Sequence, residues 1–88
     1  MEAVRRVAWN LRRLRVARGV AQEALADFAG VDRTYVSRLE RAKENPTIAV
    51  LDKLARALEV DVIELLAVPV EGESAPELLR SGRKPAGR

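Results

Sequence analysis

A group of hydrogen-bonding side chains lies on one face of the segment 33–41. Its members share the side opposite the apolar Val36 and Leu39 and are Arg33, Thr34, Ser37, Arg38 and Arg41. Arginine pairs bidentately with guanine O6 and N7, and arginine and hydroxyl groups also bind phosphate oxygens. This face therefore predicts contact with a polyanion, with a solvated charged surface as the alternative.

Catalytic chemistry has little support in the same 88 residues. The chain has no His and no Cys, which removes the usual general base, the commonest metal ligand and any disulfide. It also lacks a phosphate-binding Gly loop, and a chain of this length folds as one small domain with little room for a deep cleft. We therefore predict that the protein is not an enzyme and has no cofactor, metal or small-molecule ligand.

Charge is unevenly distributed along the chain. Residues 1–43 hold ten Lys or Arg against five Asp or Glu, whereas residues 44–77 hold two against eight. A basic half beside an acidic half indicates a polyanionic partner for the first half. No apolar run approaches the roughly 20 residues of a membrane span, and the arginines near the N-terminus do not suit a signal peptide. We expect a soluble, cytoplasmic protein with no membrane partner.

Five short helices are expected to position the polar face. Apolar residues at helical spacing predict helices over 3–18, 22–29, 33–41, 48–58 and 62–67. The expected caps are Gly19 and Gly30 after the first two helices, and Asp32, Thr47 and Asp61 before the last three, with Glu64 completing a capping box. The prediction is an all-α, compact five-helix domain over residues 1–68.

The segment 69–88 differs in composition from the rest of the chain. It is rich in Glu, Gly, Ser, Pro and Arg, which favours a flexible, disordered tail. Its basic end, Arg80–Arg88, would add a loose attraction for phosphates that weakens with salt.

The helices over 22–29 and 33–41, with the three residues between them, have the spacing of a helix-turn-helix. That geometry needs a small residue where the helices cross and a relaxed φ in the turn, which Ala26 and Gly30 supply. The second helix of such a unit lies in the major groove, and its N-terminal residues reach base edges. Arg33 and Arg38 are the predicted base readers, with phosphate or solvent contact as the alternative.

Four motifs follow one another between Leu11 and Leu66: Gln22-Glu23-Ala24-Leu25-Ala26, Gly30-Val31, Ser37-Arg38-Leu39-Glu40-Arg41 and Asn45-Pro46-Thr47. In this order and at this spacing they resemble the XRE-type, phage-repressor-like helix-turn-helix family, over about two thirds of the chain. The resemblance implies a phage-repressor-like DNA-binding fold and a sequence-specific transcriptional regulator. The segment Asp32–Ser37 is also similar to the small controller proteins of restriction–modification systems.

The resemblance also implies roles for individual residues. Thr34 would contact a base, and the amide of Gln22 would meet a phosphate at the N-terminus of its helix. Arg15 and Glu40 would form an ion pair that ties the first helix to the third. Phosphate contacts are further predicted for Tyr35, Ser37, Arg41 and Lys43, although Tyr35 is equally well suited to covering the edge of the core.

One position departs from the family pattern. Gly commonly follows the Glu-Arg pair and closes the third helix with a left-handed residue, whereas this chain has Ala42. A left-handed conformation costs an L-residue roughly 1 kcal/mol or more, so we expect the loop after the third helix to be shaped differently.

Apolar residues near the last helix predict an interface. Val60, Val62, Ile63 and Leu66 are more than a short helix can bury on one side, and exposed apolar patches often mark contacts between chains. We therefore predict a homodimer through the helices over 48–58 and 62–67, on a palindromic double-stranded DNA operator, because two-fold dimers match half-sites about one helical turn apart. The alternative is an antitoxin or protein-interaction module that also regulates its own operon.

Overall fold

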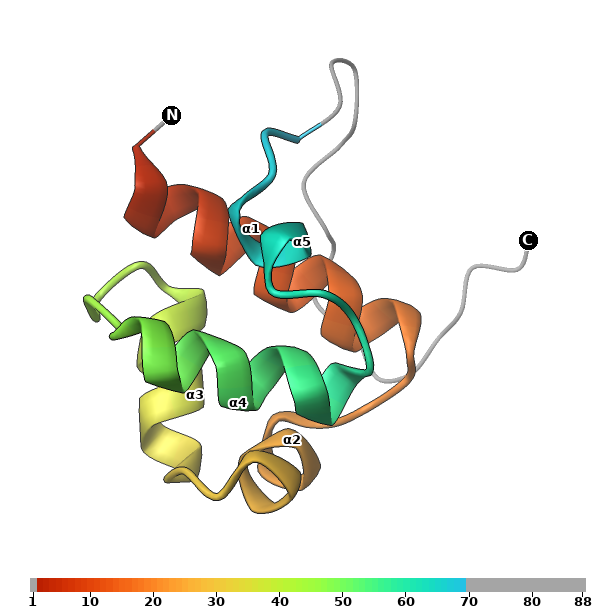
Figure 1. The fold of residues 1–88 in the computed structure, drawn as a ribbon. Coiled ribbons are helices and arrows are strands. Elements are labelled where there is room, and N and C mark those ends of the chain that lie inside the picture. Colours follow the sequence, from red (N-terminus) through yellow and green to blue (C-terminus); the bar gives the residue numbers. More distant parts are fainter. Residues whose placement is uncertain (1, 70–88) are drawn as a thin grey trace.

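The computed structural model describes residues 2–69, and this range contains five helices. They are α1 (Ala3–Ala17), α2 (Gln22–Ala29), α3 (Arg33–Glu40), α4 (Ile48–Leu58) and α5 (Ile63–Leu66). Figure 1 shows α2 and α3 on one side of α4, and α1 with α5 on the other. The predicted all-α, five-helix fold is confirmed. Beyond Pro69, the predicted tail lies outside the described residues.

The helix bounds agree closely with the periodicity of the sequence. The predictions for α2 and α4 match the structure, while α1 and α3 each end one residue earlier than predicted. Gly19 and Gly30 take positive φ values of 68° and 73°, so each glycine supplies the left-handed residue that stops its helix. The apolar pattern and the two glycines were therefore sufficient to place the first two helices.

The N-caps of the helices agree less well with the positions predicted from the sequence. Thr47 caps α4 as predicted, with its Oγ1 accepting a hydrogen bond of 3.1 Å from the N–H of Val50. Asp32 occupies the N-cap position of α3, but its side chain makes no cap hydrogen bond. The predicted cap at Asp61 is wrong by one position, because α5 is the shorter segment Ile63–Leu66 and Val62 precedes it. The Asp61 carboxylate still accepts from the N–H of Ile63 at 3.0 Å.

The core is built mainly from leucines contributed by every helix. Its fully buried side chains are Leu11, Leu25, Leu39, Leu54, Leu58, Leu65 and Val36, together with the polar Asn10. Each buried Leu or Val contributes about 1.5 to 3 kcal/mol relative to an exposed side chain. This shared core holds α3 between α2 and α1 and so determines which of its faces points outward.

A polar clamp joins α5 to α1. Nδ2 of Asn10 donates to the carbonyl oxygens of Leu65 at 3.0 Å and Ala67 at 2.8 Å, and Nη1 of Arg6 donates to that of Leu66 at 3.1 Å. These bonds satisfy carbonyls that a helix of one turn leaves without a partner. No local pattern predicted this role for Asn10, since its partners are more than 50 residues away in sequence.

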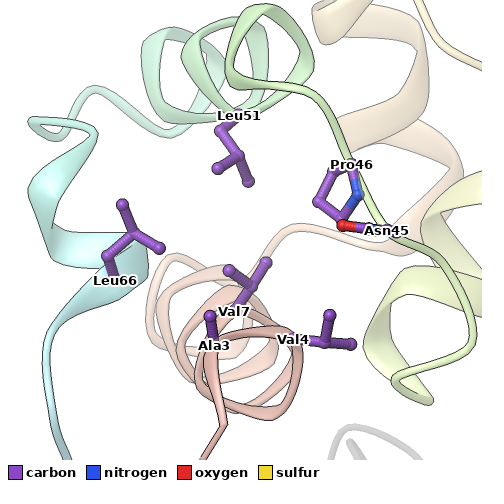
Figure 2. Close-up of a pocket in the computed structure, with 7 residues that line it drawn as sticks. All are labelled: Ala3, Val4, Val7, Asn45, Pro46, Leu51 and Leu66. Atoms are coloured by element: carbon purple, nitrogen blue, oxygen red, sulfur yellow. The ribbon is translucent and has the colours of Figure 1, made fainter.

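A small apolar hollow opens between α1, α4, α5 and the loop that follows α3. Its volume is about 140 Å³, and Figure 2 shows its lining: Ala3, Val4, Val7, Asn45, Pro46, Leu51 and Leu66. No lining side chain is ionisable, and ligand pockets are usually larger than this. Within residues 2–69, no group of three or more acidic or other metal-ligating side chains is placed to hold a metal ion. In that range no helix is long and apolar enough to cross a bilayer.

Candidate nucleic-acid interface

The turn between α2 and α3 is fixed by the backbone. Gly30 is left-handed, and the N–H of Val31 donates to the carbonyl of Ala26 at 3.0 Å, which closes the end of α2. Ala26 is itself buried where the two helices pack together. The turn therefore has the relaxed φ and the small crossing residue that a helix-turn-helix requires.

Helix α3 has one buried side and one polar exposed side. Val36 and Leu39 are completely buried, as expected. On the other side, Arg33, Thr34, Arg38, Arg41 and, just beyond the helix, Lys43 are exposed, while Ser37, Tyr35 and Gln22 are half-buried. All eight predicted DNA-contacting residues thus keep part of their surface accessible.

A buried ion pair supports α3 from behind. Nε of Arg15 lies 2.6 Å from Oε2 of Glu40, and Nη2 lies 2.9 Å from Oε1, so the two side chains pair through both arms. Only 6% of the Arg15 side chain and none of the Glu40 side chain is exposed. The remaining arm of Arg15 donates to the carbonyl of Val20 at 2.9 Å. The two residues that the family resemblance pairs are therefore in contact, and they link α1 to the end of α3.

Gln22 joins the same buried cluster. Its Nε2 donates to Oε1 of Glu40 at 3.1 Å, and Nε of Arg12 lies 3.7 Å from the same oxygen. The sequence suggested a phosphate contact for Gln22 but not this second partner. One N–H of its amide is thus used inside the protein, while the residue remains partly accessible.

Arg38 has partners that the sequence did not indicate. Its Nε donates to Oε2 of Glu44 at 2.7 Å, and its Nη2 donates to the carbonyl of Lys43 at 3.1 Å. The pair is accessible, with 44% of the Arg38 side chain and 29% of the Glu44 side chain exposed. Glu44 stands six residues beyond Arg38 in a non-helical segment, so no helical spacing pointed to the contact.

The loop after α3 keeps the left-handed residue typical of the family. Ala42 has φ of 58°, and its N–H donates to Leu39 at 3.0 Å, while the N–H of Lys43 donates to Arg38 at 2.9 Å. The expected change of loop shape is therefore wrong. Alanine adopts the conformation despite its Cβ, because two backbone hydrogen bonds close the helix end in return.

Tyr35 and Arg41 flank this loop. Burial, and secondly the Glu44 carboxylate, raise the pKa of Tyr35 above its ordinary value of 10.0. Its phenol therefore stays protonated near neutral pH and retains a proton to donate. Nε of Arg41 donates to the carbonyl of Ser37 at 3.3 Å, and no other residue in the described range 2–69 bonds to its guanidinium.

The four predicted dimer residues are not equally accessible. Ile63 exposes 63% of its surface, whereas Val60, Val62 and Leu66 are half-buried and pack against the core. Leu65 is completely buried, because α5 packs chiefly on α1. The apolar surface at α5 is therefore smaller than the sequence suggested. Ile48, at the start of α4, is also largely exposed, although helical spacing predicts it to be in the buried apolar stripe of that helix, so this prediction is wrong.

Known proteins with related sequences include transcription factors. The chain is 45% identical over 65 residues to a hypothetical transcription factor of Neisseria meningitidis, covering 74% of this chain and 61% of that protein. It is 39% identical over 66 residues to an uncharacterized HTH-type transcriptional regulator of Sinorhizobium fredii, covering 75% of this chain and 86% of the regulator. The chain thus spans less than two thirds of the Neisseria relative.

Solved structures extend the similarity to the fold. The crystal structure of a hypothetical transcription factor from Neisseria matches with a TM-score of 0.75 at 41% identity, over 77% of this chain and 78% of the other. The restriction–modification controller protein C.AhdI from Aeromonas hydrophila matches with a TM-score of 0.69 at 40% identity, over 70% of this chain and 94% of the controller.

The family comparison agrees with the geometry of α2 and α3. Residues 11–65 match the model of a helix-turn-helix family, HTH_3, and this range runs from the middle of α1 into α5. It contains the buried ion pair, the turn and the exposed face of α3. The chain therefore belongs to the helix-turn-helix family HTH_3, a family of DNA-binding transcriptional regulators.

Proposed function

We propose that the protein regulates transcription by binding a palindromic operator as a homodimer, with α3 in the major groove. The observation that carries this proposal is the first turn of α3. Arg33 and Thr34 are exposed there, and within residues 2–69 neither makes a side-chain hydrogen bond or ion pair. Their donors are thus available at the end of the helix that would enter the groove first.

The base readers in this proposal are Arg33, Thr34 and Arg38. Arg33 and Arg38 carry the fork of donors that guanine O6 and N7 accept, and the Thr34 methyl and hydroxyl suit a thymine methyl or a base edge. Gln22, Tyr35, Ser37, Arg41 and Lys43 would hold the phosphates on either side. Because the Arg15–Glu40 pair fixes α3 against α1, these side chains project from a rigid support.

The dimer would form through α5 and the residues before it. Ile63 is the exposed centre of this surface, and Val60, Val62 and Leu66 border it with their accessible halves. An exposed apolar side chain is stabilised when a second copy of the chain removes it from water. A two-fold arrangement of the dimer also places two α3 helices on one face of the duplex. The full range 1–68 would be the DNA-binding domain, with residues 69–88 as a tail.

The small size of the related controller C.AhdI supports a simple mode of action. This chain's matched region covers 94% of that controller, so a single domain of this fold accounts for nearly all of it. By analogy, occupancy of the operator would be governed by protein concentration and dimerisation. Such a regulator acts in the cytoplasm, where its operator lies.

Selection of bound duplexes from a random pool tests the proposal directly. We expect one enriched sequence with two inverted half-sites about one helical turn apart. A pool without enrichment would overturn sequence-specific binding, and a single unpaired half-site would overturn the dimer. Sedimentation of Ile63→Lys beside the wild type tests the interface independently, and unchanged association would exclude α5 from it.

A further inference from the structure

We propose that Glu44 is a specificity-determining residue that acts through Arg38, favouring contact of this arginine with a base edge over contact with a phosphate. The inference rests on the proposed function, in which the exposed face of α3 meets DNA. Neither the sequence pattern nor the family match assigns a role to Glu44. Its position follows from the tertiary structure alone.

Arg38 is held by two hydrogen bonds, but part of its guanidinium remains available for DNA. Its guanidinium has five N–H donors, and two of them are used on Oε2 of Glu44 at 2.7 Å and the carbonyl of Lys43 at 3.1 Å. Within residues 2–69 the other three donors, on Nη1 and Nη2, have no partner. These two nitrogens form the outer edge that pairs bidentately with guanine O6 and N7, so Arg38 can read a base without leaving Glu44.

The charge of Glu44 discriminates between the two kinds of DNA acceptor. A phosphate that approached Arg38 would also approach the Glu44 carboxylate, and the two negative charges would repel each other. A guanine edge carries no net charge and meets much less of this repulsion. Arg38 is therefore a weaker phosphate ligand beside Glu44 than it would be alone, while its ability to pair with guanine is retained.

The loop holds Glu44 in this position. The left-handed Ala42 reverses the chain after α3, and the N–H of Lys43 donates to the carbonyl of Arg38 at 2.9 Å. The chain thus returns along the end of α3, which brings the next residue, Glu44, beside Arg38. The same carboxylate contributes, after burial, to the raised pKa of Tyr35, a second predicted phosphate contact.

The test compares Glu44→Gln with a control that removes an equal charge elsewhere. Asp52→Asn is suitable, because Asp52 lies on α4 in an exposed ion pair of its own, 3.2 Å from Nε of Arg56. Binding of the full chain is measured on the duplex selected by the wild type and on a scrambled duplex, from about 50 to 200 mM salt. Each protein then yields a specificity ratio and two salt slopes.

For Glu44→Gln we expect tighter binding to the scrambled duplex and a specificity ratio lowered by about threefold to tenfold, because Arg38 becomes free to take a phosphate. The slope of log affinity against log salt on that duplex should steepen by about 0.9, the value of one added phosphate contact. Asp52→Asn should leave the ratio near that of the wild type. Equal ratios in the two variants would overturn the inference.

A double variant shows whether Glu44 acts through Arg38. In an Arg38→Ala background, Glu44→Gln should no longer lower the ratio, whereas a drop as large as in the parent would overturn the positioning role. The wild type separates the two proposals. If it binds both duplexes equally, the proposed function fails and the inference fails with it. If it discriminates while the variants do not differ, the inference alone fails.

Discussion

Within residues 2–69, helix α3 takes part in two short arginine–glutamate pairs that lie in very different surroundings. Arg15 and Glu40 lie 2.6 Å apart with side chains 6% and 0% exposed, whereas Arg38 and Glu44 lie 2.7 Å apart with side chains 44% and 29% exposed. The first pair is bidentate and also bonded to Gln22, while the second uses a single bond between the side chains. Each pair has one member on α3, Glu40 in the first pair and Arg38 in the second, and these two residues are two positions apart.

The two pairs differ in whether solvent can take the place of one of the partners. Little water reaches the Arg15–Glu40 pair, so removing one partner leaves a buried charge without compensation. The Arg38–Glu44 pair is accessible, and water or a DNA acceptor can take the place of either partner, so the pair itself adds little stability. The buried pair therefore holds α3, and the exposed pair is available for binding.

The largest expected effect is on the buried pair. Glu40→Ala should lower the free energy of unfolding by about 3 to 5 kcal/mol, because it leaves the Arg15 guanidinium buried and unpaired. Urea unfolding followed by circular dichroism measures the loss. Replacing both residues by Met should recover much of it, since no buried charge then remains. A loss below about 1 kcal/mol in Glu40→Ala would mean that burial does not separate the two pairs.

The opposite behaviour is expected at the start of α3. Arg33→Ala should weaken binding to the selected operator by about tenfold to a hundredfold, from the lost bidentate base contact, while the free energy of unfolding changes by less than about 0.5 kcal/mol. Fluorescence anisotropy with labelled duplex measures the affinity. Arg56→Ala, on α4, is the matched control. If both variants lose the same affinity, Arg33 contributes only general charge.

A smaller effect is expected at Ala42, which stands in the sequence between Glu40 of the buried pair and Glu44 of the exposed pair. Ala42→Gly should raise the free energy of unfolding by about 1 kcal/mol, because glycine takes a φ of 58° without the Cβ clash. Ala49→Gly, at an exposed position inside α4, should act in the other direction by about 0.5 to 1 kcal/mol. Thermal unfolding of both variants shows whether each substitution raises or lowers the free energy of unfolding. A destabilised Ala42→Gly would contradict the strain at this position.

The smallest expected effect is on the stability of the exposed pair. Glu44→Gln should change the free energy of unfolding by less than about 1 kcal/mol, because an exposed ion pair is screened by water and salt. The same urea titration provides the value, and added salt should reduce the difference further. A loss comparable to that of Glu40→Ala would show that Glu44 supports the fold, and the contrast between the pairs would disappear.

Much of the fold followed from local features of the sequence. The bounds of α2 and α4, the left-handed Gly30 and the cap at Thr47 depend on neighbouring residues, so periodicity and cap chemistry predicted them. The errors have tertiary causes. Helix α5 is one residue shorter at each end than predicted, and the carbonyls at its end bond to Asn10, which is remote in sequence. Ala42 is left-handed in a helix end that is closed by two backbone hydrogen bonds.

The features of the candidate site also divide into those that local sequence predicted and those that depended on tertiary contacts. The exposed face of α3 followed from helical spacing, and its list of polar residues needed no tertiary information. The partners of those residues, in contrast, could be identified only from the tertiary structure. Gln22 bonds to Glu40 across 18 positions, and Arg38 bonds to Glu44 from a loop with no regular spacing. Among the predicted dimer residues, only Ile63 is largely exposed, because the other three pack partly against the core.

The sequence by itself thus determined the helices, the helix-turn-helix and the family, because each depends on spacing along the chain. Only the tertiary structure decided which of two similar arginine–glutamate pairs would be sealed in the core and which would face solvent. The physical reason is that the strength of a charge pair depends on the water that surrounds it, and that water is excluded only by elements far apart in the sequence. The role of Glu44 beside Arg38 belongs to this second kind of information.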